Sequence, residues 1–319
     1  MKFKHSIQIL IDNFSVTYKQ LLYRLFITLI TFALSIAILS PLWKMFTGLE
    51  EFKNLIDSIK HFLNNLIEGN INELDNIREK VESALDSVSA LIKSHTTVIA
   101  LAMTGLILIR ILGMFFSSIG NYAAEAVIND KMALRANSPF FLTLVKNLKN
   151  ATIYSLMYVP LSFLYDVSCV ALMYFVAFKL LVFLPLLAQL FLFATAVVFA
   201  VTVKLTFASD WLPAMIRGKK KPIEAFSYSF NRKNKKTANV LANFVVLVLI
   251  IFAVNVFSLL FTFGVGALIT VPASYVILNC FQLVNYYDRE ELKYFLDKNT
   301  IIKPEKEEIL TREEFFKGE

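Results

Sequence analysis

Long apolar stretches and short charged segments alternate along this chain. Four stretches of 19 to 31 residues hold no more than one acidic or basic side chain each: Leu25–Trp43, Ser94–Ala124, Asn150–Phe178 and Leu180–Val203. A helix needs roughly 20 apolar residues to cross a hydrocarbon core of about 30 Å. The pattern therefore predicts four membrane-spanning helices.

The longest uncharged stretch, Thr237–Tyr287, has 51 residues and is too long for one span. Its middle is interrupted by Thr262-Phe-Gly-Val-Gly266, and Gly marks turns. This stretch is expected to fold back as two spans, which brings the total to six. The predicted fold class is an all-α polytopic membrane protein.

Basic residues are unevenly distributed between the two sides of the predicted membrane. If both termini are cytoplasmic, 23 of the 32 Lys and Arg lie in cytoplasmic segments and 7 in the opposite ones. Basic residues near helix ends are retained in the cytoplasm. We therefore expect both termini to be cytoplasmic.

The spans divide the chain into four predicted parts. Residues 1–48 form an amphipathic segment and span 1, residues 49–94 an extracytoplasmic insert, residues 95–290 spans 2 to 6, and residues 291–319 a charged cytoplasmic tail. In the tail, Leu292, Phe295 and Leu296 follow helical spacing, which predicts a solvated helix.

The insert 49–94 carries two apolar stripes at helical spacing on either side of Gly69-Asn70. They predict two helices of about 20 residues in an antiparallel hairpin, rising roughly 30 Å above the membrane. Nine acidic and five basic residues make it net −4. The two stripes pack against each other in one interpretation and dock a partner protein in the other.

The spacing of equivalent features indicates an internal repeat. A short amphipathic segment followed by Lys precedes each odd-numbered span, with the lysines at Lys19, Lys149 and Lys233. The last two are 84 residues apart, as are the first two once the 46 residues of positions 49–94 are removed. Three hairpin repeats, each preceded by an amphipathic interfacial helix, are predicted. The alternative is that hairpins of similar length recur by chance.

The composition agrees with a membrane protein and excludes a water-soluble domain. Apolar residues make up 57% of the 319 residues and charged residues 18%, whereas soluble domains are about 45–50% apolar and about 25% charged. The net charge of +7 follows membrane sidedness, so no nucleic-acid partner is expected. Cys169 and Cys280 lie in apolar stretches and are expected to be buried thiols.

Signatures of catalysis are missing from the sequence. The three His fall at positions 5, 61 and 95, so no pair has the spacing of a metal site. The sequence contains no nucleotide-binding or hydrolase motif. We expect no metal, no cofactor and no enzymatic activity, and an enzyme acting on membrane lipids is the weakest alternative.

Arg110 and Asp166 are the two charges deep within predicted spans. A charge at the bilayer centre costs several kcal/mol unless it is paired or faces water, so both are expected to point into the bundle. They form a buried pair that fixes spans 2 and 3, form part of a polar pathway, or make no contact with each other. Uncharged polar candidates in spans 4 to 6 either coordinate a polar ligand or bond neighbouring helices: Gln189, Asn255 and Asn279.

Two basic clusters flank the third amphipathic segment. They comprise Arg217, Lys219, Lys220 and Lys221 before it and Arg232, Lys233, Lys235 and Lys236 after it. Basic residues this close to a bilayer attract anionic lipid headgroups at about 1 kcal/mol each. Binding of anionic lipid is therefore predicted. The alternative is that the clusters only set the topology.

Residues from about 200 to 290 resemble a known group of proteins. The resemblance lies in Asp210, Gly218–Pro222, Phe226, Val271-Pro272 and Tyr286-Tyr287. This segment is similar to a broad set of bacterial six-span membrane proteins, including the membrane domain attached to some glycerophosphodiester phosphodiesterases. The resemblance implies a six-span fold in a bacterial inner membrane. It transfers no catalytic residue, and we expect no attached hydrolase domain and no hydrolase activity.

Two functions of different classes follow from these features. The first is a bacterial inner-membrane protein that binds or moves a small or amphiphilic solute through the six-span bundle. The alternative is a structural or assembly factor that binds partner proteins through the 49–94 hairpin and anionic lipid through its basic cytoplasmic face. A wet cavity beside the intramembrane charges favours the first function.

Overall fold

The computed structural model describes residues 2–48, 53–54, 56–57, 60, 64, 93–176, 184–230, 234–297, 299–303 and 308–311. It contains two compact units. The smaller unit is Ile27–Gly113 and the larger unit combines Met1–Phe26 with Met114–Glu319. The predicted 49–94 hairpin lies largely outside the described residues, so its structure stays a prediction.

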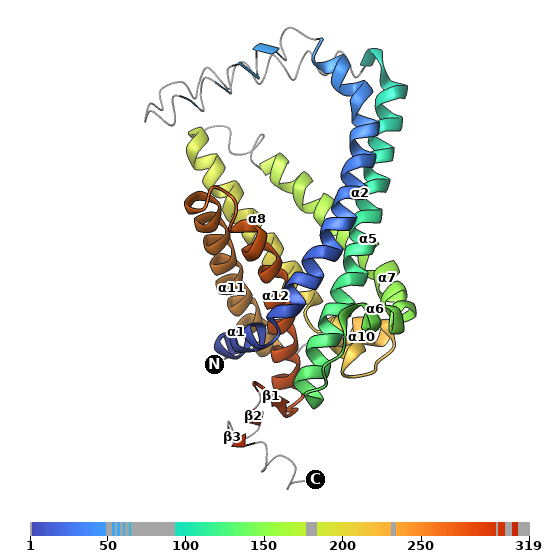
Figure 1. The fold of residues 1–319 in the computed structure, drawn as a ribbon. Coiled ribbons are helices and arrows are strands. Elements are labelled where there is room, and N and C mark those ends of the chain that lie inside the picture. The colour runs from blue at the N-terminus through green and yellow to red at the C-terminus, as the bar shows by residue number, and fades with distance from the viewer. Residues whose placement is uncertain are drawn as a thin grey trace. The chain divides into compact units, whose positions relative to one another are not determined.

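Six helices in the described part of the chain are long and apolar enough to cross a membrane. They are α2 (Phe14–Phe46), α5 (Thr96–Leu134), α7 (Leu148–Phe175), α8 (Leu186–Ala208), α11 (Asn234–Phe261) and α12 (Ala267–Arg289) (Figure 1). The predicted helical, multi-pass membrane fold is confirmed. Several helices are longer than the apolar stretches that predict them. Polar residues can continue a helix where their side chains reach water or buried polar partners.

The turn between α11 and α12 lies where the glycines predicted it. Phe263 and Gly264 have positive φ angles of 50° and 88°, in the left-handed region that Gly enters at little cost. The backbone N–H of Gly264 donates to the carbonyl of Leu259 at 2.9 Å and closes the end of α11. The long uncharged stretch therefore forms two helices.

In the smaller unit, α2 and α5 approach each other closely. A Cβ added at Gly105 would lie 2.7 Å from Cδ1 of Ile38, and one added at Gly113 would lie 3.3 Å from Cγ2 of Thr31. Small residues allow membrane helices to pack at short separation. Gly105 therefore serves the packing of this helix pair.

In the larger unit, a short helix precedes three of the long ones. These are α1 (Lys2–Asp12) before α2, α6 (Phe140–Lys146) before α7, and α10 (Pro222–Phe230) before α11. They coincide with the three predicted amphipathic segments. The 84-residue repeat itself stays a prediction, because chain order and helix lengths alone do not establish internal symmetry.

The main hydrophobic cluster of the larger unit joins α1, α5, α7, α9 (Trp211–Ile216), α10, α12 and the C-terminal sheet. Trp211 is 2% exposed, and its indole N–H donates to the carbonyl of Pro222 at 3.0 Å. The Tyr287 hydroxyl donates to the side-chain oxygen of Asn129 at 2.9 Å. These two hydrogen bonds join α9 to α10 and α12 to α5.

The C-terminal tail forms a small sheet, so the helix predicted there is wrong. Strands β1 (Tyr294–Phe295), β2 (Thr300–Lys303) and β3 (Glu308–Thr311) pair antiparallel in the order β1-β2-β3. The carboxylate of Asp297 accepts the backbone N–H groups of Asn299 and Thr300, both at 2.8 Å, and turns the chain. Tyr294, Phe295 and Leu296 are buried in succession, as in an extended chain that is packed on both faces. The helical spacing of apolar residues in the sequence does not distinguish this case.

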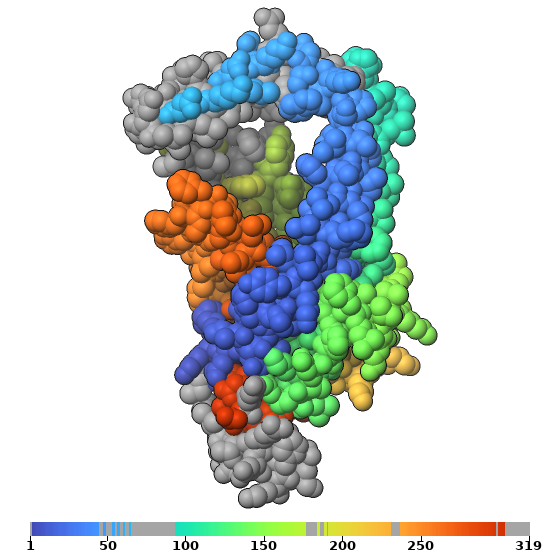
Figure 2. Space-filling model, viewed as in Figure 1, coloured from blue at the N-terminus to red at the C-terminus, as the bar shows by residue number. Residues whose placement is uncertain are grey.

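Helix α1 lies against α12 and this sheet (Figure 2). Lys2 forms an ion pair with Asp288 at 3.2 Å, and the Gln8 amide donates to Asp297 at 2.8 Å. Nδ1 of His5 is 2.9 Å from the Tyr294 hydroxyl. The first and last segments of the chain are therefore joined by polar contacts.

Candidate functional site

Helices α5, α7, α8 and α12 surround a cavity of about 340 Å³ in the larger unit, which we call the polar cavity. Most of its surface is apolar, and hydroxyl, amide and charged groups are placed within that surface. The polar and aromatic lining residues are Ser118, Asn121, Tyr154, Tyr158, Asp166, Lys204, Tyr275, Asn279 and Gln282. All four helices are candidate spans, so the cavity lies among membrane-spanning segments.

An ion pair lies at the edge of the polar cavity. The Lys204 ammonium contacts both carboxylate oxygens of Asp166, at 2.7 and 2.8 Å. The two residues are 38 positions apart and come from α8 and α7. Their side chains are 22% and 41% exposed, so the pair is reachable from the cavity rather than sealed in protein.

Within the larger unit, the partner of Asp166 is Lys204, a residue that the sequence pattern did not single out. The pairing of Asp166 with Arg110 stays a prediction. Arg110 lies in the smaller unit, exposed on α5, while the carboxylate of Asp166 is bound by Lys204. Arg110 is absent from the lining of the polar cavity. Lys204 supplies the positive charge because α8 continues to Ala208, beyond the end of the uncharged stretch.

Two buried polar groups in the lining lack a protein partner. The Ser118 hydroxyl and the Asn279 amide nitrogen have no hydrogen-bond partner among the described residues. Their residues are 3% and 6% exposed. An unpaired buried polar group costs about 1–3 kcal/mol, so these groups are held at a cost to stability. Both residues line the polar cavity, and the two polar atoms are themselves buried beside it.

Aromatic rings form another part of the lining. Tyr154 and Tyr158 stack at a centroid distance of 5.2 Å. The Arg24 guanidinium carbon lies 3.5 Å from the Tyr275 ring centroid, and its Nη2 donates to the side-chain oxygen of Asn121 at 2.6 Å. The cavity thus combines apolar ring faces with hydrogen-bonding groups.

The other two intramembrane candidates lie outside the polar cavity. The Asn255 amide donates to the Ser274 hydroxyl and to the carbonyl of Ile251, both at 2.8 Å, and joins α11 to α12. The Gln189 amide donates to the carbonyl of Leu184 at 3.1 Å. The interhelical alternative holds for Asn255, and of the three predicted amides only Asn279 lines the polar cavity.

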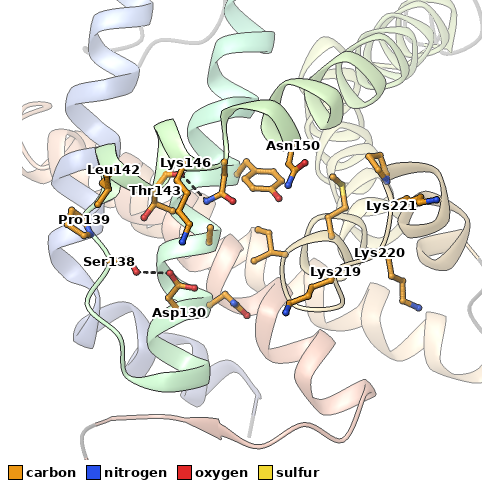
Figure 3. Close-up of a pocket in the computed structure, with 17 residues that line it drawn as sticks. Asp130, Ser138, Pro139, Leu142, Thr143, Lys146, Asn150, Lys219, Lys220 and Lys221 are labelled. Carbon is orange, nitrogen blue, oxygen red and sulfur yellow. Dashed lines mark hydrogen bonds between the residues drawn. The ribbon is translucent and has the colours of Figure 1, made fainter.

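A second cavity of about 510 Å³ lies at the ends of α5 and α7, next to α6 and the loop between α9 and α10. We call it the basic cavity (Figure 3). Its charged and polar lining residues are Tyr122, Asn129, Asp130, Ser138, Thr143, Lys146, Asn147, Asn150, Lys219, Lys220 and Lys221. Four lysines and a single carboxylate are among the lining residues, so the lining is net positive.

Only some residues of the two predicted lipid-binding clusters line the basic cavity. Lys219, Lys220 and Lys221 line the basic cavity. Arg217 instead lies 5.5 Å from the Tyr287 ring centroid. Arg232 and Lys233 lie outside the described residues, and Lys235 and Lys236 lie at the beginning of α11.

Three residues of this region were not singled out by the sequence pattern. Lys204 and Glu125 looked like the charged ends of spans, and Lys146 like one basic residue of a cytoplasmic loop. Glu125 is fully buried, one turn along α5 from Asn121 in the polar cavity and Tyr122 in the basic cavity. A charge next to an apolar run marks a helix end in sequence, but here the helix continues.

The described residues contain no cluster of three His, Cys, Asp or Glu side chains placed to hold a metal ion. The chain matches no protein-family model, no curated protein and no solved structure. The resemblance to bacterial six-span membrane proteins therefore stays a prediction.

Proposed function

We propose that this multi-pass membrane protein binds a small polar or amphiphilic solute in the polar cavity and moves it within or across the membrane. The observation that carries the proposal is that Ser118 and Asn279, each with an unpartnered buried polar group, line the same cavity as the Asp166–Lys204 ion pair. Polar groups inside a membrane protein are costly and usually mark solute or ion pathways.

The lining indicates what kind of solute the polar cavity suits. Lys204 and Asn279 donate hydrogen bonds, Asp166 accepts them, and the stacked rings of Tyr154 and Tyr158 offer an apolar surface. A solute with both a hydrogen-bonding group and an apolar part would satisfy this lining. The volume of about 340 Å³ is in the range of small-molecule sites.

The test replaces the two unpartnered groups with apolar ones of similar size, as Ser118→Val and Asn279→Leu. Replacing an unpaired buried polar group in this way is neutral or stabilising, so the fold should persist. Wild-type protein in nanodiscs made from native membranes should carry a small molecule detectable by mass spectrometry. Each variant should bind it about tenfold more weakly, the equivalent of one lost hydrogen bond.

Asn255→Leu is the matched control, because it removes an amide of the same kind outside the polar cavity. It should retain the bound molecule. The proposal fails if the wild type carries no small molecule, or if the control loses it as fully as Asn279→Leu does. Melting temperatures of all four proteins separate lost binding from lost folding.

Several expectations stay predictions of the sequence. A bacterial inner-membrane location with cytoplasmic termini rests on the distribution of basic residues. Partner binding through residues 49–94 concerns a segment largely outside the described residues. The expected lack of enzymatic activity rests on the motifs that the sequence does not contain.

A further inference from the structure

The basic cavity brings together positive charges from two separate elements. Lys146 comes from the end of α6, and Lys219 from the loop between α9 and α10 (Figure 3). The one acidic lining residue, Asp130, accepts a hydrogen bond from the Ser138 hydroxyl at 2.6 Å. Repulsion between lysines held around one cavity is relieved most directly by a bound anion.

The loop that carries three of the lysines is held in one conformation. A Cβ at Gly218 would lie 2.5 Å from the Tyr286 hydroxyl and 2.6 Å from the carbonyl oxygen of Ala214, so only Gly fits. Lys219 has a φ of 49°, in the left-handed region. The backbone N–H of Lys220 donates to the carbonyl of Ala214 at 3.1 Å. A fixed loop lowers the entropic cost of binding a ligand.

The lysines of this loop have different roles. The Lys220 ammonium lies 3.7 Å from the centroid of the Tyr228 ring, so it is already in a cation–π contact. Lys219 extends toward α5 and Asp130, across the cavity from α6 (Figure 3). Lys146 and Lys219 are therefore the pair best placed to contact an anion from two sides.

Exposed apolar side chains flank the basic cavity and indicate where the anion comes from. On α6, Phe141, Leu142 and Val145 are 55%, 64% and 67% exposed. On α10, Ile223 and Phe230 are 71% and 50% exposed. Short helices with apolar faces beside basic residues lie in the membrane interface with their apolar side chains among the acyl chains.

We propose that the basic cavity binds the phosphate group of an anionic phospholipid, with Lys146 and Lys219 contacting the phosphate. The exposed side chains of α6 and α10 then lie among the acyl chains of the same leaflet. A lysine ammonium binds phosphate as a compact charge without demanding planar geometry. This inference does not depend on a solute in the polar cavity.

The experiment counts lipids bound to the full-length protein by native mass spectrometry, with phosphatidylglycerol and phosphatidylcholine supplied in equal amounts. The wild type should retain phosphatidylglycerol selectively. Lys146→Gln combined with Lys219→Gln should weaken that binding about 30-fold, from two basic residues at about 1 kcal/mol each. Lys219→Arg, which keeps the charge, should retain most of it.

Lys149→Gln is the matched control, because Lys149 is exposed three residues after Lys146 but does not line the cavity. It should bind phosphatidylglycerol like the wild type. An equal loss in this control would mean that total charge attracts lipid, and the proposed site would be wrong. Selective binding that survives the double substitution would also overturn it.

A further arm distinguishes a lipid from a free phosphate. Leu142→Ser removes an acyl-chain contact but no charge, so it should weaken binding of phosphatidylglycerol. Glycerol 3-phosphate carries the charge without acyl chains and should compete only at a far higher concentration. Competition by glycerol 3-phosphate at concentrations similar to those of the lipid, with no effect of Leu142→Ser, would show a site for a soluble phosphate and contradict the lipid assignment.

Discussion

Glu125 is the most unusual residue of the larger unit. It is fully buried on α5, and neither carboxylate oxygen has a hydrogen-bond partner among the described residues. The nearby Asp210 adds a second negative charge within electrostatic range, although Asp210 is itself paired with Arg289. A buried carboxylate without a partner costs several kcal/mol.

Glu125→Gln should therefore raise the melting temperature in detergent, because it removes the ionisable carboxyl group while keeping the shape. A gain of about 1–2 kcal/mol corresponds to roughly 2–8 °C for a protein of this size class. Differential scanning fluorimetry measures the change. Glu291→Gln makes the same substitution at an exposed position and should leave the melting temperature unchanged. A lower melting temperature for Glu125→Gln would mean that the carboxyl group at this position is needed for folding.

At the scale of elements, the docking of α1 depends on a titratable contact. His5 faces Tyr294, with Asp288, Lys4 and the N-terminus as the nearby charges. Burial lowers the pKa of His5 below its usual value of 6.5, which outweighs the opposing effect of Asp288. Burial, reinforced by Asp288, raises the pKa of Tyr294, so this phenol stays neutral near pH 7.

Because the pKa of His5 is lower in the folded protein than in the unfolded chain, protonation favours release of α1. Docking should be strongest above about pH 6.5 and should weaken as the pH falls through that value toward the lower folded pKa. Hydrogen exchange of the α1 amides, corrected for the intrinsic rate, should be faster at pH 5.5 than at pH 7.5. In His5→Gln this difference should disappear.

Asp297, another titratable group at this contact, should not titrate in that range. Burial opposes its charge, but the backbone N–H groups of Asn299 and Thr300 and the Gln8 amide outweigh burial and hold the pKa of Asp297 below its usual value. Its contribution to docking is therefore lost only at a still lower pH. An unchanged pH dependence in His5→Gln would exclude His5 as the group responsible.

At the scale of the whole molecule, the orientation in the membrane can be tested by thiol labelling. Cys280 is buried and Cys169 lies within α7, so a membrane-impermeant maleimide should label the wild type poorly. Lys60→Cys should react in intact cells, because residues 49–94 are predicted outside. Lys303→Cys should react only after permeabilisation. The reverse pattern would place the termini outside and contradict the charge-based orientation.

Much of the fold could be predicted because membrane insertion depends on local composition. The six spans, the turn at Gly264 and the short helices before α2, α7 and α11 all follow from apolar length, charge and turn residues. The tail could not be predicted in this way, because its three strands become stable only through packing against each other and α1. A short strand is not stable by itself, and its few residues carry little sequence pattern that would predict it.

The polar cavity was only partly predictable. Asp166 and Asn279 stand out as polar residues in apolar surroundings, whereas Lys204 resembles the charged end of a span. The pairing of Asp166 with Lys204 depends on how α7 and α8 are rotated toward each other. The positions of Lys219 and Lys220 in the basic cavity likewise depend on the close contact at Gly218.

The sequence by itself determined the protein class, the number of spans and the places where the chain turns. Each of these depends on the apolar and charged residues within a window of about 20 neighbours. Because burying charge in lipid is costly, such a window shows plainly whether a segment spans the membrane. Only the tertiary structure decided which polar side chains meet, which stay unpartnered and which lysines share a cavity. Such contacts join residues far apart in the chain, and they are set by the rotation and packing of whole helices.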